Sequence, residues 1–450
     1  MRVGMGFAAH ETMSIRQAVR GVVCKLNLKS LDAVVVVYLK IEAAICAWWC
    51  RRNYARVLRL IRAKPSGQRL KVLFIVSEPA KWKCQTLYEA LARSDKFEPL
   101  VGLSAWNCQS DMTDDELERH HAMSEEFFDR LGDRHVRTVF TKPRRFVDLR
   151  TLNPDIVIYN EQWRPCKLQH PVTVSRFALT FFIPYYVPVF GNMFIHCEQP
   201  VEQLSYVYFT LNAEWEKLFA PYFSPRLSTA KFVSLGYPAL DPFARKAMRD
   251  TTKHTVIFAP HFAIPVKGDR PGCDWQISQS TFDWSGKMIL EYAKCHPEVD
   301  WVFKPHPLLR EKIALTGFMS RREMDEYYVE WERVGSVCCS GDYQELFNDS
   351  CLMLTDSGSF LAEYAATGHP LVHLWCPEND VEIPRPTRLL MDTFYRVSTP
   401  EELEKTLKLV VEDRQDPKRE ERLRVVKELG LCDNDAAKNM VAYFKDLLRR

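Results

Sequence analysis

Six short apolar runs, most of them followed by loop residues and a helical pattern, constrain the fold of this chain most strongly. They are KVLFIV at 71–76, DIVIY at 155–159, TVIFA at 255–259, DWVFK at 300–304, CLMLT at 351–355 and PLVHL at 370–374. A continuous apolar run of this length is typical of a strand that is buried on both faces, and alternation with helices indicates βαβ units in a parallel sheet. We therefore expect an α/β fold.

The runs form two consecutive groups, which predicts two Rossmann-like, doubly wound domains that face a cleft. The length of 450 residues fits two or three domains. We place the first domain at 70–235 and the second at 236–430, with a basic helical segment at 1–69 and a C-terminal helix at 431–450. Ligands of such sheets bind beyond the carboxyl ends of the strands.

Two local patterns in the first domain are informative. Thr113 precedes a helical pattern that runs to Leu131, and Glu116 follows three residues later, which predicts a capping box. Residues 161–190 contain several aromatic side chains and four prolines. We expect this strand-poor stretch to form functional loops rather than a core element.

Basic residues are concentrated at the N-terminus. Residues 1–70 contain 13 Lys/Arg and 3 Asp/Glu, and the remaining 380 residues contain 48 and 55, although the net charge of the whole chain is only +3. Within 51–62 the apolar residues share one helical face and the arginines take the other. Such a helix suits an anionic membrane surface, with Trp48 and Trp49 at the interface.

Two other interpretations of this segment stay open. The helix would alternatively pack on the body of the protein and leave its arginines in solvent. The apolar run at 31–49 would alternatively span the membrane, but Asp32, Lys40 and Glu42 interrupt it. We expect a peripheral protein at the cytoplasmic face of the cell membrane.

Composition excludes several classes of protein. Hydrophobic residues make up 46% and charged residues 26%, which excludes wholesale disorder and a polytopic membrane protein. The 14 Cys residues show no CxxC pair and no Cys/His ligand spacing, so we expect reduced thiols and no metal site. The acidic body and the absence of a recognisable fold in the basic arm argue against a nucleic-acid partner.

Basic side chains follow two strands of the second predicted domain. Lys304 and His306 belong to a Lys-Pro-His-Pro turn, and His261 follows the preceding strand. Lys304 supplies fixed positive charge, and His306 would donate to a phosphate oxygen or stabilise a leaving diphosphate. The alternatives are a rigid strand exit with a solvated histidine and, for His261, an ordinary loop residue.

A third strand is followed by a small polar turn and a helix. Its residues are Asp356, Ser357, Gly358 and Ser359. Backbone N–H groups, the serine hydroxyls and the positive helix end would together form an anion cradle, which glycine lets a phosphate approach closely. Glu363, one turn into the helix, would reach a ribose hydroxyl pair. The alternatives are a plain N-cap and a solvated glutamate.

Four motifs occur in order along the chain. They are Gly236-Tyr237-Pro238 with Asp241, Lys304-Pro305-His306-Pro307, Thr355-Asp356-Ser357-Gly358-Ser359-Phe360 with Glu363, and Gly368-His369-Pro370. Together they resemble the CDP-glycerol glycerophosphotransferase family of teichoic acid and capsule synthesis. The similarity covers roughly residues 150–390.

The resemblance implies a GT-B fold that needs no metal and no cofactor. It also implies a CDP-glycerol or related CDP-polyol donor, and a lipid-linked glycan or polyol-phosphate acceptor at the inner face of the membrane. Carried over to this chain, the resemblance implies that the domain at 70–235 binds the acceptor and the domain at 236–430 binds the CDP-linked donor. His306, Ser357 and Ser359 would hold the donor diphosphate, with Lys304 nearby.

One motif of the family is missing here. Better-known members have a Trp-His-Gly-Thr segment whose histidine is the proposed base, whereas residues 182–188 of this chain read FIPYYVP. The next imidazole is His196, so we expect His196 or His261 to take the acceptor proton. Tyr185 is a poor base because a tyrosine has a pKa of ~10.

We therefore predict a transferase that moves glycerol phosphate, or a related polyol phosphate, from a CDP-activated donor to a membrane-linked acceptor. CMP would be released, and positioning with charge stabilisation by His306 and its neighbours would supply most of the catalysis. Two alternatives stay open: a GT-B glycosyltransferase that uses a nucleotide sugar, and a non-catalytic scaffold of a polymer-assembly complex.

Overall fold

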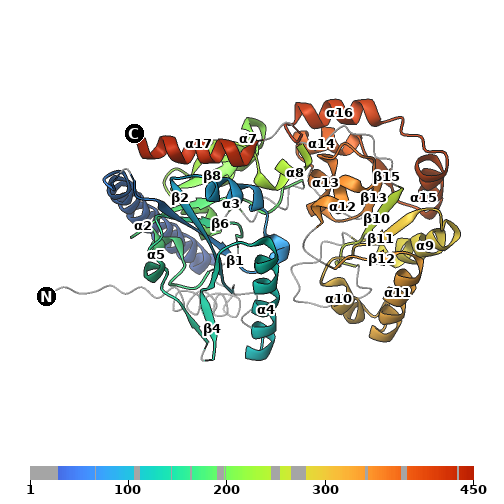
Figure 1. The fold of residues 1–450 in the computed structure, drawn as a ribbon, viewed down its shortest axis with the longest axis horizontal. Helices are drawn as coiled ribbons and strands as arrows, with labels where there is room; N and C mark the ends of the chain where they lie inside the picture. The colour runs from blue at the N-terminus through green and yellow to red at the C-terminus, as the bar shows by residue number, and fades with distance from the viewer. Residues whose placement is uncertain are drawn as a thin grey trace. The chain divides into compact units, whose positions relative to one another are not determined.

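The computed structural model describes residues 29–65, 67–105, 112–142, 144–162, 165–189, 197, 199–244, 254–264, 280–339, 343–376, 383–432 and 435–449. These residues form two compact units (Figure 1). Unit 1 takes the described residues within 1–185, 195–235 and 437–450, and unit 2 takes those within 186–194 and 236–436.

Unit 1 is built around a parallel sheet of seven described strands in the order β3-β2-β1-β6-β7-β8-β9. Their bounds are β1 Leu70–Val76, β2 Phe97–Leu103, β3 His135–Arg137, β6 Ile156–Tyr159, β7 Leu179–Phe182, β8 Val207–Thr210 and β9 Lys231–Ser234. Phe74 of β1 lies opposite Val101 of β2 and Ile158 of β6. An antiparallel pair, β4 (Val139–Thr141) and β5 (Arg144–Phe146), stands apart from this sheet.

The expectation that residues 161–190 form only strand-poor loops is wrong for the four residues of β7. This strand is buried along its whole length and pairs with β6 and β8. The four residues of β7 read LTFF and are too few to show periodicity. They form a strand because they are buried between two neighbouring strands.

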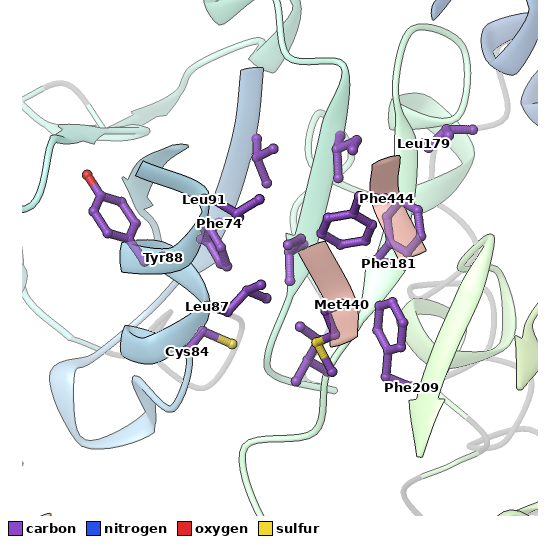
Figure 2. Packing of buried hydrophobic residues seen from close by; sticks show 14 of the residues in the cluster. Phe74, Cys84, Leu87, Tyr88, Leu91, Leu179, Phe181, Phe209, Met440 and Phe444 are labelled. Carbon is purple, nitrogen blue, oxygen red and sulfur yellow. The ribbon is translucent and has the colours of Figure 1, made fainter. Parts of the chain in front are cut away.

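Helices far apart in the sequence share the core of unit 1. They include α2 (Lys29–Arg62), α3 (Gln85–Ala92), α4 (Asp114–Leu131), α5 (Pro171–Val174), α6 (Pro200–Gln203), α7 (Ala213–Phe219) and α17 (Ala436–Arg449). Figure 2 shows Met440 and Phe444 of α17 beside Phe181 and Phe209, and the rings of Phe444 and Phe181 lie 5.1 Å apart. The helix that the sequence places at the end of the chain therefore packs in the core of unit 1.

The capping box predicted at the start of α4 is confirmed. The Thr113 hydroxyl accepts a hydrogen bond from the Glu116 backbone N–H, and the Glu116 carboxylate accepts one from the Thr113 N–H. Gly132 ends the helix with a φ of 70°, a left-handed conformation that glycine adopts without strain.

Helix α2 packs one face into unit 1. Its buried residues recur at helical spacing and are Ala47, Cys50, Tyr54, Val57 and Ile61. The Tyr54 hydroxyl donates to the Leu204 carbonyl at 2.6 Å, so the contact is polar as well as apolar. Among the helices that the structure describes, α2 included, none is long and apolar enough to cross a membrane.

Unit 2 contains a parallel sheet of six described strands in the order β12-β11-β10-β13-β14-β15. Their bounds are β10 Thr255–Ala259, β11 Asp300–Phe303, β12 Ser336–Val337, β13 Leu352–Thr355, β14 Leu371–Leu374 and β15 Tyr395–Val397. The described helices are α8 Asp241–Ala244, α9 Phe282–Cys295, α10 Leu309–Thr316, α11 Arg321–Val334, α12 Gln344–Asp349, α13 Gly358–Ala365, α14 Arg385–Asp392, α15 Pro400–Leu407 and α16 Arg419–Glu428.

Both sheets reverse their strand order at one point. In unit 1 the chain proceeds outward from β1 to β3 and then from β6 to β9 on the other side, and in unit 2 the reversal falls between β10 and β13. This is the strand order of doubly wound dinucleotide-binding folds, in which ligands bind at the carboxyl ends of the strands beside the reversal. The prediction of two Rossmann-like units is confirmed.

Candidate functional site

The site residues predicted in unit 2 lie in loops that follow three neighbouring strands. Strand β10 lies between β11 and β13, and all three are parallel. His261 follows β10, Lys304 and His306 follow β11, and the turn that begins at Asp356 follows β13. These loops therefore leave the same edge of the sheet, at its switch point.

Two imidazoles meet at this edge. The rings of His261 and His306 lie 5.2 Å apart, and Phe262 packs 4.5 Å from the His306 ring. The His306 N–H donates to the Pro260 carbonyl at 3.0 Å, which ties the two loops together. We conclude that the histidines belong to one cluster.

Hydrogen bonds fix which ring nitrogen carries the proton in each neutral histidine. The Nδ1 atom of His261 accepts from the Ala263 N–H at 3.2 Å, and that of His306 accepts from the Leu308 N–H at 3.1 Å. In the neutral form, Nε2 is then the protonated nitrogen of each ring.

His261 is uncharged at neutral pH. Burial first, and the neighbouring His306 second, lower the pKa of His261 to about 3. An imidazole that releases its proton so readily is a weak proton acceptor. This argues against His261 as the base and leaves it a neutral partner of His306.

We expect His261 to make the stability of the protein depend on pH. Between its folded pKa of about 3 and the ordinary value of ~6.5, the unfolded chain binds a proton that the folded protein does not. The stabilising contribution is complete above ~6.5 and is lost as the pH falls toward 3. His261→Gln removes the titration and keeps a hydrogen-bond acceptor.

The measurement is urea unfolding at pH 7.5 and pH 5.0. The wild type should lose ~2 kcal/mol more than His261→Gln between these two values. Equal losses in the two proteins would contradict the assignment of a neutral, half-buried His261.

Asp356 holds the loops rather than presenting its carboxylate outward. One oxygen accepts from the His261 N–H at 2.5 Å and the other from the Thr281 N–H at 2.9 Å. The residue is buried, and burial raises the pKa of Asp356 to about 6, against the opposing effect of these hydrogen bonds. Asp356 therefore joins the exit of β13 to the exit of β10.

The N-terminus of α13 lies directly after Asp356. Ser357 occupies the N-cap position of α13, but its side chain makes no capping hydrogen bond. Capping of the helix by the Ser357 hydroxyl therefore does not account for a serine at this position. The Ser357 N–H donates to the Thr355 hydroxyl at 3.0 Å, and that hydroxyl donates to the Ala259 carbonyl at 2.7 Å. Gly358 is buried and Ser359 half-buried in the first turn, where backbone N–H groups favour an anion.

Lys304 and Glu363 are linked through a tyrosine that the sequence analysis did not identify. The Lys304 ammonium lies 4.9 Å from the centre of the Tyr343 ring, and the Tyr343 hydroxyl donates to the Glu363 carboxylate. All three residues are buried. The alternative of a solvated Glu363 is wrong, because Tyr343 and the core around it enclose the carboxylate. Tyr343 lies 39 residues beyond Lys304, so no local pattern signals the contact.

The remaining motifs have structural roles in the described residues. Gly236 and Gly368 have φ values of 89° and 79°, left-handed conformations that favour glycine. The Asp241 carboxylate accepts from the Ala436 N–H at 2.8 Å, at the first residue of α17. His196 lies outside the described residues. Within the described ranges no group of three or more His, Cys, Asp or Glu is placed to hold a metal ion.

Several solved structures have a similar fold. MnaA of S. aureus in complex with UDP is 12% identical, with 85% of this chain and 98% of that chain covered and a TM-score of 0.50. UDP-GlcNAc 2-epimerase of Neisseria meningitidis bound to UDP-GlcNAc is 13% identical, with 84% and 100% covered and a TM-score of 0.50. A variant of the wall teichoic acid polymerase TagF is 11% identical, with 92% and 97% covered and a TM-score of 0.50.

These likenesses show a GT-B type fold. No protein-family model matches the sequence, and no curated protein does. The predicted fold class is therefore confirmed. Because the identities are only 11–13%, the likenesses do not show the reaction, the donor or the acceptor. These have to be argued from the residues of the site.

Proposed function

We propose that this protein is a transferase whose unit 2 binds the diphosphate of a CDP-activated polyol phosphate, such as CDP-glycerol. One observation carries the proposal: three loops, which leave the neighbouring strands β10, β11 and β13, bring His261, the Lys304–His306 turn and the first turn of α13 to one switch point. A cation, a ring N–H donor and a helix N-terminus are the groups that bind a diphosphate.

In the proposed reaction an acceptor hydroxyl attacks the distal phosphorus of the donor. The bond from this phosphorus to the CMP oxygen breaks, and CMP leaves with the electron pair. The His306 Nε2–H and the N-terminal N–H groups of α13 would stabilise the negative charge on the leaving phosphate. Lys304, held against Tyr343 and Phe360, would supply positive charge to the same region.

The direct test is CMP release. Purified protein is incubated with CDP-glycerol, and in parallel with CDP-ribitol, in the presence of membranes that carry acceptor, and CMP is measured. We expect CMP to appear only when donor and acceptor membranes are both present. No release with any CDP-polyol would overturn the proposal.

A nucleotide-sugar donor is the second candidate. Two solved structures with this fold hold UDP or UDP-GlcNAc. Thermal denaturation with each nucleotide separates the candidates, because a bound ligand raises the melting temperature. Stabilisation by UDP-sugars and not by CDP-glycerol would favour a glycosyltransferase, and stabilisation by neither would favour a non-catalytic scaffold.

We also propose that α2 holds the protein on an anionic membrane surface at the cytoplasmic face. A second apolar stripe of α2 faces solvent, and its residues, each close to half exposed, are Tyr38, Ile41, Ile45, Trp48 and Trp49. The Arg52 guanidinium lies 5.7 Å from the Trp48 ring. Exposed aromatic side chains beside exposed basic residues match the interface of an anionic bilayer.

Replacing Trp48 and Trp49 together by alanine should weaken binding to vesicles with 30% anionic lipid by about 30-fold, because each ring contributes about 1 kcal/mol of apolar burial. Sedimentation with vesicles measures the bound fraction. Met123→Ala, at an exposed apolar residue of α4, is the matched control and should bind like the wild type. Unchanged binding of the double variant would exclude this stripe as the contact.

A further inference from the structure

Lys304 carries a positive charge inside unit 2. The residue is only 6% exposed, and its ammonium lies 4.9 Å from the centre of the Tyr343 ring and 5.8 Å from that of the Phe360 ring. The two ring centres are 5.3 Å apart. The electron-rich face of an aromatic ring attracts a cation, and the attraction is stronger where water is excluded. The two rings therefore hold the ammonium in one place.

Tyr343 is itself held from two directions. Its ring packs 4.5 Å from the Phe347 ring, and Phe347 packs 5.3 Å from Phe360. Its hydroxyl donates to the Glu363 carboxylate. Because Lys304 follows β11 and Glu363 belongs to α13, Tyr343 joins the exit of β11 to that helix.

Glu363 balances the charge of Lys304. Both residues are buried, and the Tyr343 side chain contacts both of them. A buried charge without an opposite charge nearby is costly, whereas opposite charges attract each other over a longer range in a protein interior than in water. Glu363 is therefore suited to be the counter-charge that keeps the Lys304 ammonium charged inside unit 2.

The burial of Glu363 argues against the contact with a ribose that the sequence analysis expects. A carboxylate must be accessible if it is to accept hydrogen bonds from the two hydroxyls of a ribose. Glu363 is 2% exposed, and one of its oxygens already accepts the Tyr343 hydroxyl. His306, in contrast, is half-buried. The imidazole is therefore open to a ligand and the carboxylate is not.

We propose that Tyr343 is a positioning residue of the donor site, that it joins Lys304 to Glu363 as its counter-charge, and that Glu363 does not bind the donor ribose. The inference rests on the proposed function, because it specifies how the same site takes a nucleoside diphosphate. Lys304 attracts the diphosphate through the field of its charge, and Tyr343 fixes where that charge lies. All of these residues belong to unit 2.

Two nucleotides that differ only in the hydroxyl pair of the ribose test the role of Glu363. The dissociation constants of CDP and of 2′,3′-dideoxy-CDP are measured by calorimetry for the wild type and for Glu363→Gln, which keeps an acceptor for the Tyr343 hydroxyl. We expect the ratio of the two constants to agree between the proteins within about twofold, because the carboxylate does not contact the ribose. A larger change in this ratio would show a ribose contact and overturn the assignment.

Inorganic pyrophosphate tests the role of Tyr343, because it carries the diphosphate and no ribose. Tyr343→Leu removes the ring and the hydroxyl, and it should weaken the binding of pyrophosphate and of CDP by the same factor, about tenfold. Tyr343→Phe keeps the ring, so its affinity for both ligands should stay within about threefold of the wild type. A role in folding alone would not predict that the conservative variant restores the affinity.

The matched control is Tyr292→Leu. The Tyr292 hydroxyl also donates to a glutamate, Glu412, at 3.0 Å. Tyr292 lies in the last turn of α9, the helix that precedes β11, and therefore near the beginning of that strand rather than at its exit. The variant loses a similar tyrosine–glutamate contact at the opposite edge of the sheet, and it should bind pyrophosphate and CDP like the wild type.

The outcomes separate this inference from the proposed function. A wild-type protein that binds neither CDP nor CDP-glycerol and releases no CMP overturns both. If the wild type binds CDP, a Tyr343→Leu variant with wild-type affinity for pyrophosphate overturns the positioning role alone. Equal losses in Tyr343→Phe and Tyr343→Leu would also overturn it, because the ring would then not hold Lys304. Glu363→Gln and Tyr343→Phe nearly keep the side-chain volumes, so the test does not depend on the folding of Tyr343→Leu.

Discussion

Replacing His306 by alanine is expected to lower the rate of CMP release by about 100-fold. The Leu308 N–H holds His306 Nδ1 as an acceptor, so the ring donates through Nε2. A donor aimed at charge that develops on a leaving phosphate acts mainly in the transition state, and its loss is therefore felt in kcat more than in donor affinity.

The matched control is His254→Ala. His254 lies just before β10, at the opposite end of the strand that His261 follows, and its carbonyl accepts from the Asp300 N–H through the backbone alone. Alanine keeps that contact, so His254→Ala should retain the wild-type rate. A His306→Ala variant within threefold of the wild type would remove His306 from the site.

Replacing Asp356 by alanine is expected to lower the free energy of unfolding by about 3 kcal/mol, because the buried N–H groups of His261 and Thr281 would each lose an acceptor. For a unit of this size the melting temperature should drop by roughly 10 °C. Because Asp356 also joins the exits of β10 and β13, CMP release should be lost even below the new melting temperature.

Thermal and urea unfolding at pH 7.5 measure the stability effect. The control is Asp300→Ala, at an exposed aspartate that begins β11 in the same sheet. We expect this control to unfold within 2 °C of the wild type. An Asp356→Ala variant with wild-type stability would mean that the carboxylate does not carry the loop connections described here.

The sequence predicts best what is encoded locally. Apolar runs such as 255–259 and 351–355 are long enough to identify buried strands, and the residues after them must lie at one edge of a parallel sheet. Their position at this edge is enough to predict that His261, His306 and the turn at Asp356 lie close together. The capping box at Thr113 is likewise contained within four residues.

Features that depend on distant contacts were not predictable in the same way. Ser77 and Glu161 are separated by 84 residues, and no local pattern pairs them. Both stripes of α2 are apolar, so the sequence alone does not indicate which of them is buried in unit 1. Helix α17 belongs to the core of unit 1 through Met440 and Phe444.

Hydrogen–deuterium exchange with and without CDP-glycerol tests the central claim most directly, because it reports where the donor binds without requiring an acceptor. The account predicts slower exchange in peptides that cover 260–264, 304–309 and 356–363, and unchanged exchange in those that cover 77–81. No protection in the first three peptides at a saturating donor concentration, or protection confined to other parts of the chain, would contradict it.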